Sequence, residues 1–286
     1  MEQKHVRIIG IFLALIMVTS VMALFFGGSG NSSSRDGDAT DLEDAPGFEI
    51  ISGTQFNAEM NSLSDGLAFT PEGVSNAIYV DYSRTYGTPL QDYNITDLYA
   101  YYNTLMVKRF SAYDSSSNFG FEAHVLTPEV VNFNYATAGM YNGYSLLQRG
   151  TNIYNIIGTP TLLGDRNTLE KVIDVRSGTG QSSTDFTEIM SYVESGAEFQ
   201  RVSSSDTIAE QYYVEFRNMG DGNYTRTEIF VAPADTTVNA IYDLEATSDE
   251  RDLLYNITLE DEGRIVKVVI STDASNFFNL AMEQFR

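Results

Sequence analysis

The longest apolar stretch of the chain lies near its start. Residues 8–26 carry no charged side chain, and Lys4 and Arg7 precede them. At about 1.5 Å per residue this run makes a helix of roughly 28 Å, close to the hydrocarbon thickness of a bilayer. Because the cationic residues lie on one side only, the positive-inside rule leaves residues 1–7 as a cytoplasmic tip. The pattern predicts a transmembrane signal anchor over residues 8–26, with the remainder of the chain outside.

Two other interpretations of this stretch stay open. Val21-Met22-Ala23 fits the small-residue pattern at which a signal peptide is cleaved. A buried core helix would need a partner surface for a segment that has no polar face. Cleavage after Ala23 would still leave the following residues outside the cytoplasm, so the extracytoplasmic placement does not depend on the choice between anchor and signal peptide.

Residues 27–47 have a composition typical of a linker. A part rich in glycine and serine is followed by an acidic part between Asp36 and Asp44. Glycine and serine lose much backbone entropy on ordering, and the acidic side chains have nothing to bury, so we expect a flexible linker. A calcium loop is the alternative. Counting from Asp36, however, the twelfth position is Gly47 instead of the glutamate of an EF-hand loop.

From residue 48 onward, short segments of period 2 and period 3.6 follow one another. Strands are predicted over residues 75–83, 119–126, 144–147, 153–163, 211–217, 224–231, 240–247, 253–260 and 264–271. Helices are predicted over residues 96–110, after a cap at Asp165, over 184–193 and over 275–284. Residues 48–286 are therefore expected to form an extracytoplasmic α+β domain, with a mixed or antiparallel sheet and a few packed helices.

A short internal similarity suggests a division of this domain. Gly87-Thr88-Pro89 and Gly158-Thr159-Pro160 each follow a predicted strand and precede a predicted helix. Duplication of a strand–turn–helix unit would explain the similarity, and so would chance. If the unit is duplicated, the domain has halves at residues 48–143 and 144–286.

Composition excludes several classes of protein. The chain has no cysteine, which rules out disulfides, zinc–thiolate sites, iron–sulfur clusters and cysteine catalysis. Its net charge of −22 repels nucleic acid, so we expect no nucleic-acid partner. An acidic surface of this kind suits raised ionic strength, where salt screens self-repulsion.

The residues that usually carry catalysis are scarce. His124 is the one histidine beyond the predicted anchor, and strand alternation places it on the same face as Glu122. A Ser-His-Asp site is not formally excluded, but the chain lacks the Gly-x-Ser-x-Gly elbow that holds a nucleophile. We interpret His124 as a strand-face histidine paired with Glu122 or a tyrosine. We assign no catalytic, cofactor-binding or metal-binding residue and expect no cofactor.

Carboxylate pairs are the one catalytic device that this composition supplies. A glycoside hydrolase needs two carboxyl groups roughly 5–10 Å apart. Most of the acidic residues lie in predicted turns, and the chain has no tryptophan on which a sugar could stack. The 18 tyrosines are compatible with a binding surface, or with aromatic core positions in a protein without tryptophan.

Four sequons are candidate N-glycosylation sites. Each satisfies Asn-x-Ser/Thr without proline, at Asn31, Asn94, Asn223 and Asn256. Asn31 lies in the linker, Asn94 at a predicted helix start and Asn223 at a predicted hairpin tip, all exposed settings. Asn256 lies within a predicted strand and can be modified only if its side chain points to solvent.

The chain resembles a group of surface proteins. The hydrophobic anchor, the acidic Ser/Asp linker, the sequons and the cysteine-free domain with few lysines together look like uncharacterised membrane-anchored extracytoplasmic proteins of methanogenic archaea. The resemblance implies display at the cell surface and assigns no catalytic residue.

These observations favour a membrane-anchored extracytoplasmic protein of the cell membrane that spans the bilayer once. We expect a non-enzymatic role as a binding, surface-associated or accessory-subunit protein. Its expected partners are membrane lipid, through the N-terminal helix, and a protein of the membrane or cell envelope. The alternative is an extracellular hydrolase of the glycosidase type that uses paired carboxylates.

Overall fold

The computed structural model describes residues 42, 45–93, 97–114, 116, 119–205 and 207–285. The stretch Leu42–Arg286 forms one compact unit. Among the described residues, none of the helices has the length and apolar character needed to cross a membrane. The predicted cytoplasmic tip 1–7, the predicted anchor 8–26 and nearly all of the predicted linker 27–47 lie outside the described residues, as do Asn31 and Asn94.

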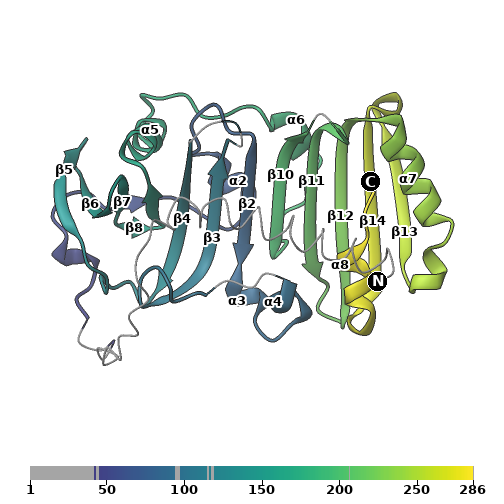
Figure 1. Ribbon diagram of the computed structural model, residues 1–286, viewed down its shortest axis with the longest axis horizontal. Helices are drawn as coiled ribbons and strands as arrows, with labels where there is room; N and C mark the ends of the chain where they lie inside the picture. The colour runs from purple at the N-terminus through teal and green to yellow at the C-terminus, as the bar shows by residue number, and fades with distance from the viewer. Residues whose placement is uncertain are drawn as a thin grey trace, which may run out of the picture. The chain divides into compact units, whose positions relative to one another are not determined.

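The unit is built on one sheet of twelve strands, in which every neighbouring pair is antiparallel (Figure 1). From one edge to the other the strands are β13 (Leu254–Glu260), β14 (Ile265–Asp273), β12 (Asn223–Pro233), β11 (Ala209–Asn218), β10 (Phe199–Ser205), β2 (Asn76–Asp81), β3 (Leu105–Tyr113), β4 (Gly120–Thr127), β9 (Thr161–Gly164), β7 (Ile153–Ile156), β6 (Tyr144–Gly150) and β5 (Ala136–Tyr141). A separate parallel pair joins β1 (Phe56–Asn57) to β8 (Gly158–Thr159). The expected α+β class with a large antiparallel sheet is confirmed.

The helices are short and few. They are α2 (Leu63–Leu67), α3 (Tyr82–Thr85), α4 (Pro89–Tyr93), α5 (Arg166–Arg176), α6 (Thr187–Met190), α7 (Asp235–Glu245) and α8 (Phe277–Met282). The predicted cap of α5 is confirmed, because the Asp165 carboxylate accepts a hydrogen bond from the Thr168 backbone N–H at 3.1 Å. That bond satisfies one of the amides that a helix leaves unpaired in its first turn.

One face of the sheet, which we call the α5 face, is covered by α2, α5 and α6. Alternate strand residues such as Phe110, Tyr213 and Ile229 pack there with Leu63, Leu169 and Ile189 of the three helices in a single core cluster. The period of 2 along each strand puts these residues on one side.

The opposite face, the α8 face, carries two separate clusters. Phe230 and Val268 pack with α7 and α8, whereas Met106 and Leu126 pack with the segments around Tyr102 and Phe133. Both faces of the sheet are therefore buried over much of their area, which explains strands that are apolar on both sides.

Strand order repeats on either side of the β2–β10 pair. Outward from that pair the order is β2-β3-β4-β9-β7 on one side and β10-β11-β12-β14-β13 on the other. The helices that follow the two sets pack on opposite faces, α5 on one and α8 on the other. The repeat is one of strand order, and the halves 48–143 and 144–286 stay a prediction.

One expected helix is wrong and another is too long. Residues 96–110 were expected as a helix, but a turn holds Tyr102, Asn103 has φ +51°, and β3 begins at Leu105. Leu98, Tyr102 and Met106 match helical spacing because turn and strand residues line the same cluster. The expected helix 184–193 shortens to the four residues of α6.

The expected strand 240–247 is also wrong, because α7 occupies Asp235–Glu245. Ile241 is buried and Val238 and Leu244 are partly buried against the same cluster. Their spacing of three residues is that of one helix face, and it outweighs the β-branched side chains in this segment. The expected strand 153–163 is divided into β7, β8 and β9, and the other predicted strands and the last helix are present with bounds shifted by a few residues.

Candidate functional site

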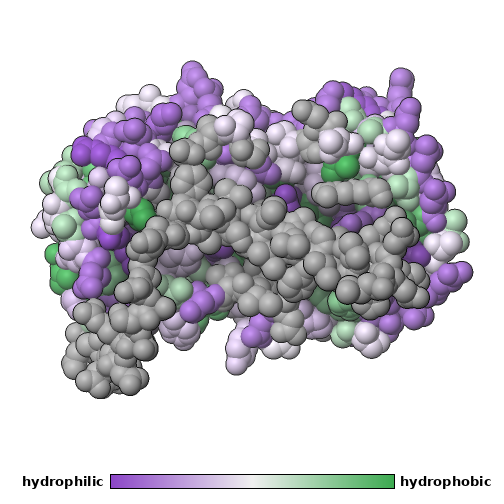
Figure 2. Space-filling model, in the orientation of Figure 1, coloured by the Kyte–Doolittle hydropathy of each residue, from purple (hydrophilic) through white to green (hydrophobic). Residues whose placement is uncertain are grey.

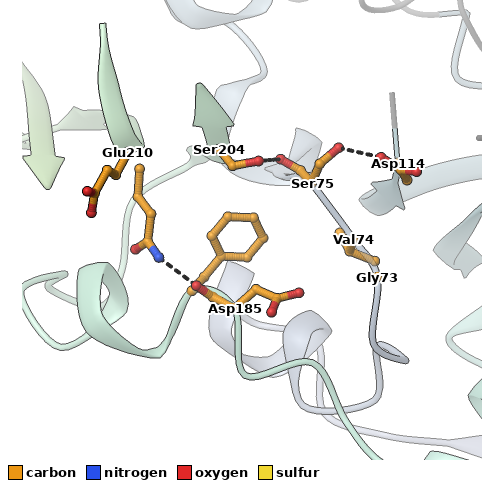
Figure 3. A pocket seen from close by; sticks show the side chains of 9 residues that line it. Gly73, Val74, Ser75, Asp114, Asp185, Ser204 and Glu210 are labelled. Carbon is orange, nitrogen blue, oxygen red and sulfur yellow. Dashed lines mark hydrogen bonds between the residues drawn. The ribbon is translucent and has the colours of Figure 1, made fainter. Parts of the chain in front are cut away.

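An open groove lies where the central strands end near the start of α6 (Figure 3). It has a volume of about 400 Å³ and a mixed polar and apolar lining, in which Asp114, Asp185 and Glu210 supply carboxylates. Ser75 and Ser204 supply hydroxyl groups, and Phe186 also lines the groove. These groups could accept hydrogen bonds from a hydroxyl-rich or cationic ligand.

The three carboxylates of the groove do not converge. Ser75 Oγ donates to Asp114 Oδ1 at 3.1 Å, and Arg264 Nη2 lies 3.4 Å from Glu210 Oε2. In Figure 3 the side chains of Asp114, Asp185 and Glu210 point in different directions. Acid–base catalysis on a sugar needs two carboxyl groups on either side of one bond, so this arrangement favours binding over hydrolysis.

A second cluster of ionisable groups is fully enclosed on the α8 face. Glu122 and His124 have no exposed surface. Arg109 Nη2 donates to Glu122 Oε1 at 2.5 Å, and His124 Nε2 lies 2.7 Å from Glu122 Oε2. The sequence-based pairing of His124 with Glu122 is confirmed. It arises because residues two apart on a strand share a face.

Tyrosine completes this network. Tyr102 Oη lies 2.7 Å from His124 Nδ1, and Asn155 Nδ2 donates to Tyr102 Oη at 3.2 Å. The Tyr101 ring stacks on the imidazole with centroids 5.7 Å apart. An ionised carboxylate can only accept, so His124 Nε2 carries its proton, and Nδ1 is free to accept from the Tyr102 hydroxyl.

Burial and charge set the protonation of these groups in opposite ways. Burial lowers the pKa of His124, and the hydrogen bond to Glu122 only partly offsets this effect. Burial alone would raise the pKa of Glu122, but the neighbouring Arg109 guanidinium and the His124 hydrogen bond lower it to about 2. The network therefore holds a carboxylate, a guanidinium and a neutral imidazole, and within the described residues Glu122 and His124 are shielded from solvent while the Arg109 side chain is 13% exposed.

A matching carboxylate lies on the other side of the sheet's centre. Tyr212 Oη donates to Glu228 Oε2 at 2.7 Å, and the guanidinium of Arg226 forms an ion pair with Glu228. Arg226 Nη1 also donates to the Leu280 and Glu283 carbonyls at 3.0 and 2.7 Å. Arg226 thus ties β12 to the carbonyls at the end of α8.

The two glutamates lie on one row of register partners, and four strands separate the strands that carry them. Successive partners in the register are Glu122, Ser111, Ile78, Arg201, Val214 and Glu228. Sequence reasoning found the first end through His124 but missed Arg226 and Glu228. The signal was there, because Arg226 and Glu228 have the same spacing of two residues within a strand as Glu122 and His124.

The surface is otherwise acidic and offers two of the sequons. On the side drawn in Figure 2, hydrophilic residues cover most of the described surface. Asn223 and Asn256 are both exposed. Across the ranges that the structure describes, no group of three or more His, Cys, Asp or Glu residues is arranged to hold a metal ion.

The chain was compared with known families, curated proteins and solved structures. Residues 59–177 match a family model described as a family N-terminal domain. No curated protein matches the chain. No solved structure matches it either. The matched segment begins shortly before α2 and ends just after α5. It therefore contains β2 to β9, and β10 to β14 follow it in the chain.

Proposed function

We propose that this chain is a non-enzymatic binding protein held at the outer surface of a membrane by a single N-terminal anchor. Residues 48–286 would be displayed outside the cytoplasm as a partner-binding or accessory-subunit domain. The observation that carries the proposal is the uncharged run of residues 8–26, with Lys4 and Arg7 before it and a strongly acidic chain after it.

The chemistry of the described residues supports a binding role. His124 and Glu122 are buried, and their polar atoms are bonded to each other, to Arg109 and to Tyr102. Glu228 is bonded to Tyr212 and Arg226. The groove beside Phe186 is open, with a mixed polar and apolar lining, and its carboxylates do not face a common point. A groove of this kind suits a polar surface of another envelope protein better than a reaction that needs two converging carboxyl groups.

The topology can be tested by adding protease to intact cells that produce the full chain. We expect residues 48–286 to be digested while a cytoplasmic marker protein stays whole, and both to be digested after the membrane is dissolved. Survival of the domain on intact cells, under conditions that digest known surface proteins, would contradict the proposal.

A charge variant provides the matched control. Lys4→Glu with Arg7→Glu removes the positive bias that retains the N-terminus inside. We expect the protease-accessible fraction to fall in this variant, while Lys108→Glu in the outer domain leaves it unchanged. An equal effect of both variants would show that the N-terminal charges do not set the orientation.

A further inference from the structure

The two edges of the sheet differ in how they are protected. At one edge, the register of β5 against β6 shifts between Thr137 and Met140, where Gly139 has φ +117°. Such an irregularity twists an edge strand and discourages another chain from pairing with it. At the other edge, β13 pairs with β14 through seven consecutive partners without a shift.

β13 lacks three of the usual protective devices, namely a bulge, a lysine and a proline. Within the ranges that the structure describes, its backbone pairs with β14 alone, which leaves the hydrogen-bonding groups of its outer edge unpaired with another strand. Leu254 and Leu259 are 68% and 52% exposed. A regular edge of this length with two exposed leucines is a template for pairing with a second copy of the same strand.

Asn256 lies near the middle of this edge and points away from the core. It is opposite Val269 in the register, on the α5 face, whereas α7 and α8 pack on the other face of the sheet. Asn256 and Thr258 of the sequon are both exposed. The condition set by the sequence, that Asn256 must point to solvent, is therefore met.

We propose that Asn256 carries an N-linked glycan and that this glycan prevents β13 from pairing with a second copy of the chain. The inference rests on the extracytoplasmic placement proposed above. The donor is a lipid-linked oligosaccharide: the bond from the sugar C1 to the carrier phosphate breaks, the phosphate leaves with the carrier, Asn256 Nδ2 bonds to C1, and the amide releases one proton.

The geometry explains why a glycan at this position would block pairing. An antiparallel pair of β13 strands centred on Ile257 puts Asn256 of one copy opposite Thr258 of the other. Directly opposed residues in antiparallel strands have Cβ atoms about 4.5–5.5 Å apart. A sugar linked to Asn256 would occupy the space that the partner's side chains need.

Asn223 provides a matched control within the same domain. It is also an exposed sequon asparagine, at the first position of β12. β12 pairs with β11 on one side and with β14 on the other, so it has no open edge. A glycan at Asn223 would leave the state of association unchanged.

The modification is tested by mass spectrometry of the full chain purified from its native membranes. We expect the peptide containing Asn256 to carry added sugar mass, which Asn256→Gln and Thr258→Ala abolish and Thr258→Ser retains. An unmodified Asn256 peptide, in a protein that protease reaches on intact cells, would overturn this inference and leave the proposed function standing. Inaccessibility to protease would overturn both.

The consequence for association is tested by sedimentation of the detergent-solubilised full chain. With rising concentration, we expect the mass of Asn256→Gln to approach twice that of the monomer, while Asn223→Gln stays monomeric. Adding Leu259→Lys to Asn256→Gln should restore the monomer, because a lysine on the edge opposes pairing. A monomeric Asn256→Gln protein, or a dimer that Leu259→Lys leaves intact, would overturn the protective role.

Discussion

Glu122 and Glu228 lie at matching positions on the α8 face, yet their surroundings are built differently. Counted outward from the β2–β10 pair, each glutamate is on the third strand, and both lie on the same row of register partners. Glu122 is held by Arg109 of the neighbouring strand and by His124 of its own. Glu228 is held by Tyr212 of the neighbouring strand and by Arg226 of its own. In the first network the cation lies on the neighbouring strand and the neutral partner on the same strand as the glutamate. In the second network the two are the other way round.

This exchange changes what each network attaches to the sheet. Through His124 the first network reaches Tyr102, and so adds a side-chain contact to a turn whose Leu98 carbonyl already accepts a backbone hydrogen bond from Met106 of β3. Through Arg226 the second network reaches the carbonyls at the end of α8. A buried carboxylate needs a partner in either case, and the choice of partner decides whether a turn or a terminal helix is fixed.

The largest effect is expected for Arg226→Ala. This variant leaves the buried Glu228 without its counter-ion and removes the donor to the α8 carbonyls. Breaking a buried ion pair costs about 3–5 kcal/mol. The free energy of unfolding in urea, followed by tyrosine fluorescence, should fall by this amount. A loss typical of a surface pair would show that water reaches Glu228.

Its control removes both charges together. Arg226→Met with Glu228→Leu replaces the pair by apolar side chains of similar size, so no buried charge is left alone. We expect the double variant to recover most of the stability that Arg226→Ala loses. A double variant as unstable as the single one would mean that the α8 contacts matter more than the charge pairing.

Glu122→Gln is expected to have a smaller effect. The amide keeps the size of the side chain and can still hydrogen-bond, but Arg109 loses its carboxylate. Hydrogen bonds to a charged group contribute about 1.5–3 kcal/mol, so a loss within that range is expected in the same urea measurement. Arg109→Met with Glu122→Leu serves as the apolar control. An effect equal to that of Arg226→Ala would remove the difference between the two networks.

Tyr102→Phe tests the attachment of the turn. The ring and its packing remain, but His124 Nδ1 loses its hydroxyl donor and Asn155 loses an acceptor. A buried polar group left without a partner costs about 1–3 kcal/mol. Hydrogen exchange should rise locally in residues 97–104 and not in α8. Equal exchange in both places would mean that the Tyr102 hydroxyl does not hold the turn separately.

Strand alternation made part of the first network predictable. The period of 2 over residues 119–126 put Glu122 and His124 on one face, and the structure pairs them. Tyr102 could not be placed in the same way, because it was assigned to a helix that is in fact a turn followed by β3. Two partners on the same strand can be recognised from their spacing in the sequence, whereas the position of the turn that covers them depends on tertiary contacts.

The second network and the groove were out of reach for a related reason. Arg226 interacts with carbonyls 54 to 57 positions along the chain. The groove brings together Ser75, Asp114, Asp185 and Glu210 from the ends of separate elements. Pairings of this kind depend on strand order, and the sequence predicted the strands but not their order. The misassigned α7 has the same origin, since Ile241 is apolar in either conformation and only its neighbours show which one forms.

The smallest effect is expected from pH, and it should separate the networks most cleanly because only the first contains a histidine. Burial lowers the folded-state pKa of His124 below its ordinary value of 6.5, so below about pH 6.5 the unfolded chain binds a proton that the folded chain does not. Stability is therefore lost as pH falls through this window, by at most about 1.4 kcal/mol per pH unit. Glu122 adds a second loss below about pH 4.5 as its own folded pKa of about 2 is approached.

His124→Gln should flatten the slope of the unfolding free energy between pH 6.5 and 5, whatever its effect on stability at pH 7. Arg226→Met with Glu228→Leu keeps His124 and should retain the slope. The same slope in all three proteins would show that His124 is protonated as readily in the folded domain as in the unfolded chain, and the neutral imidazole that distinguishes the first network from the second would have to be given up.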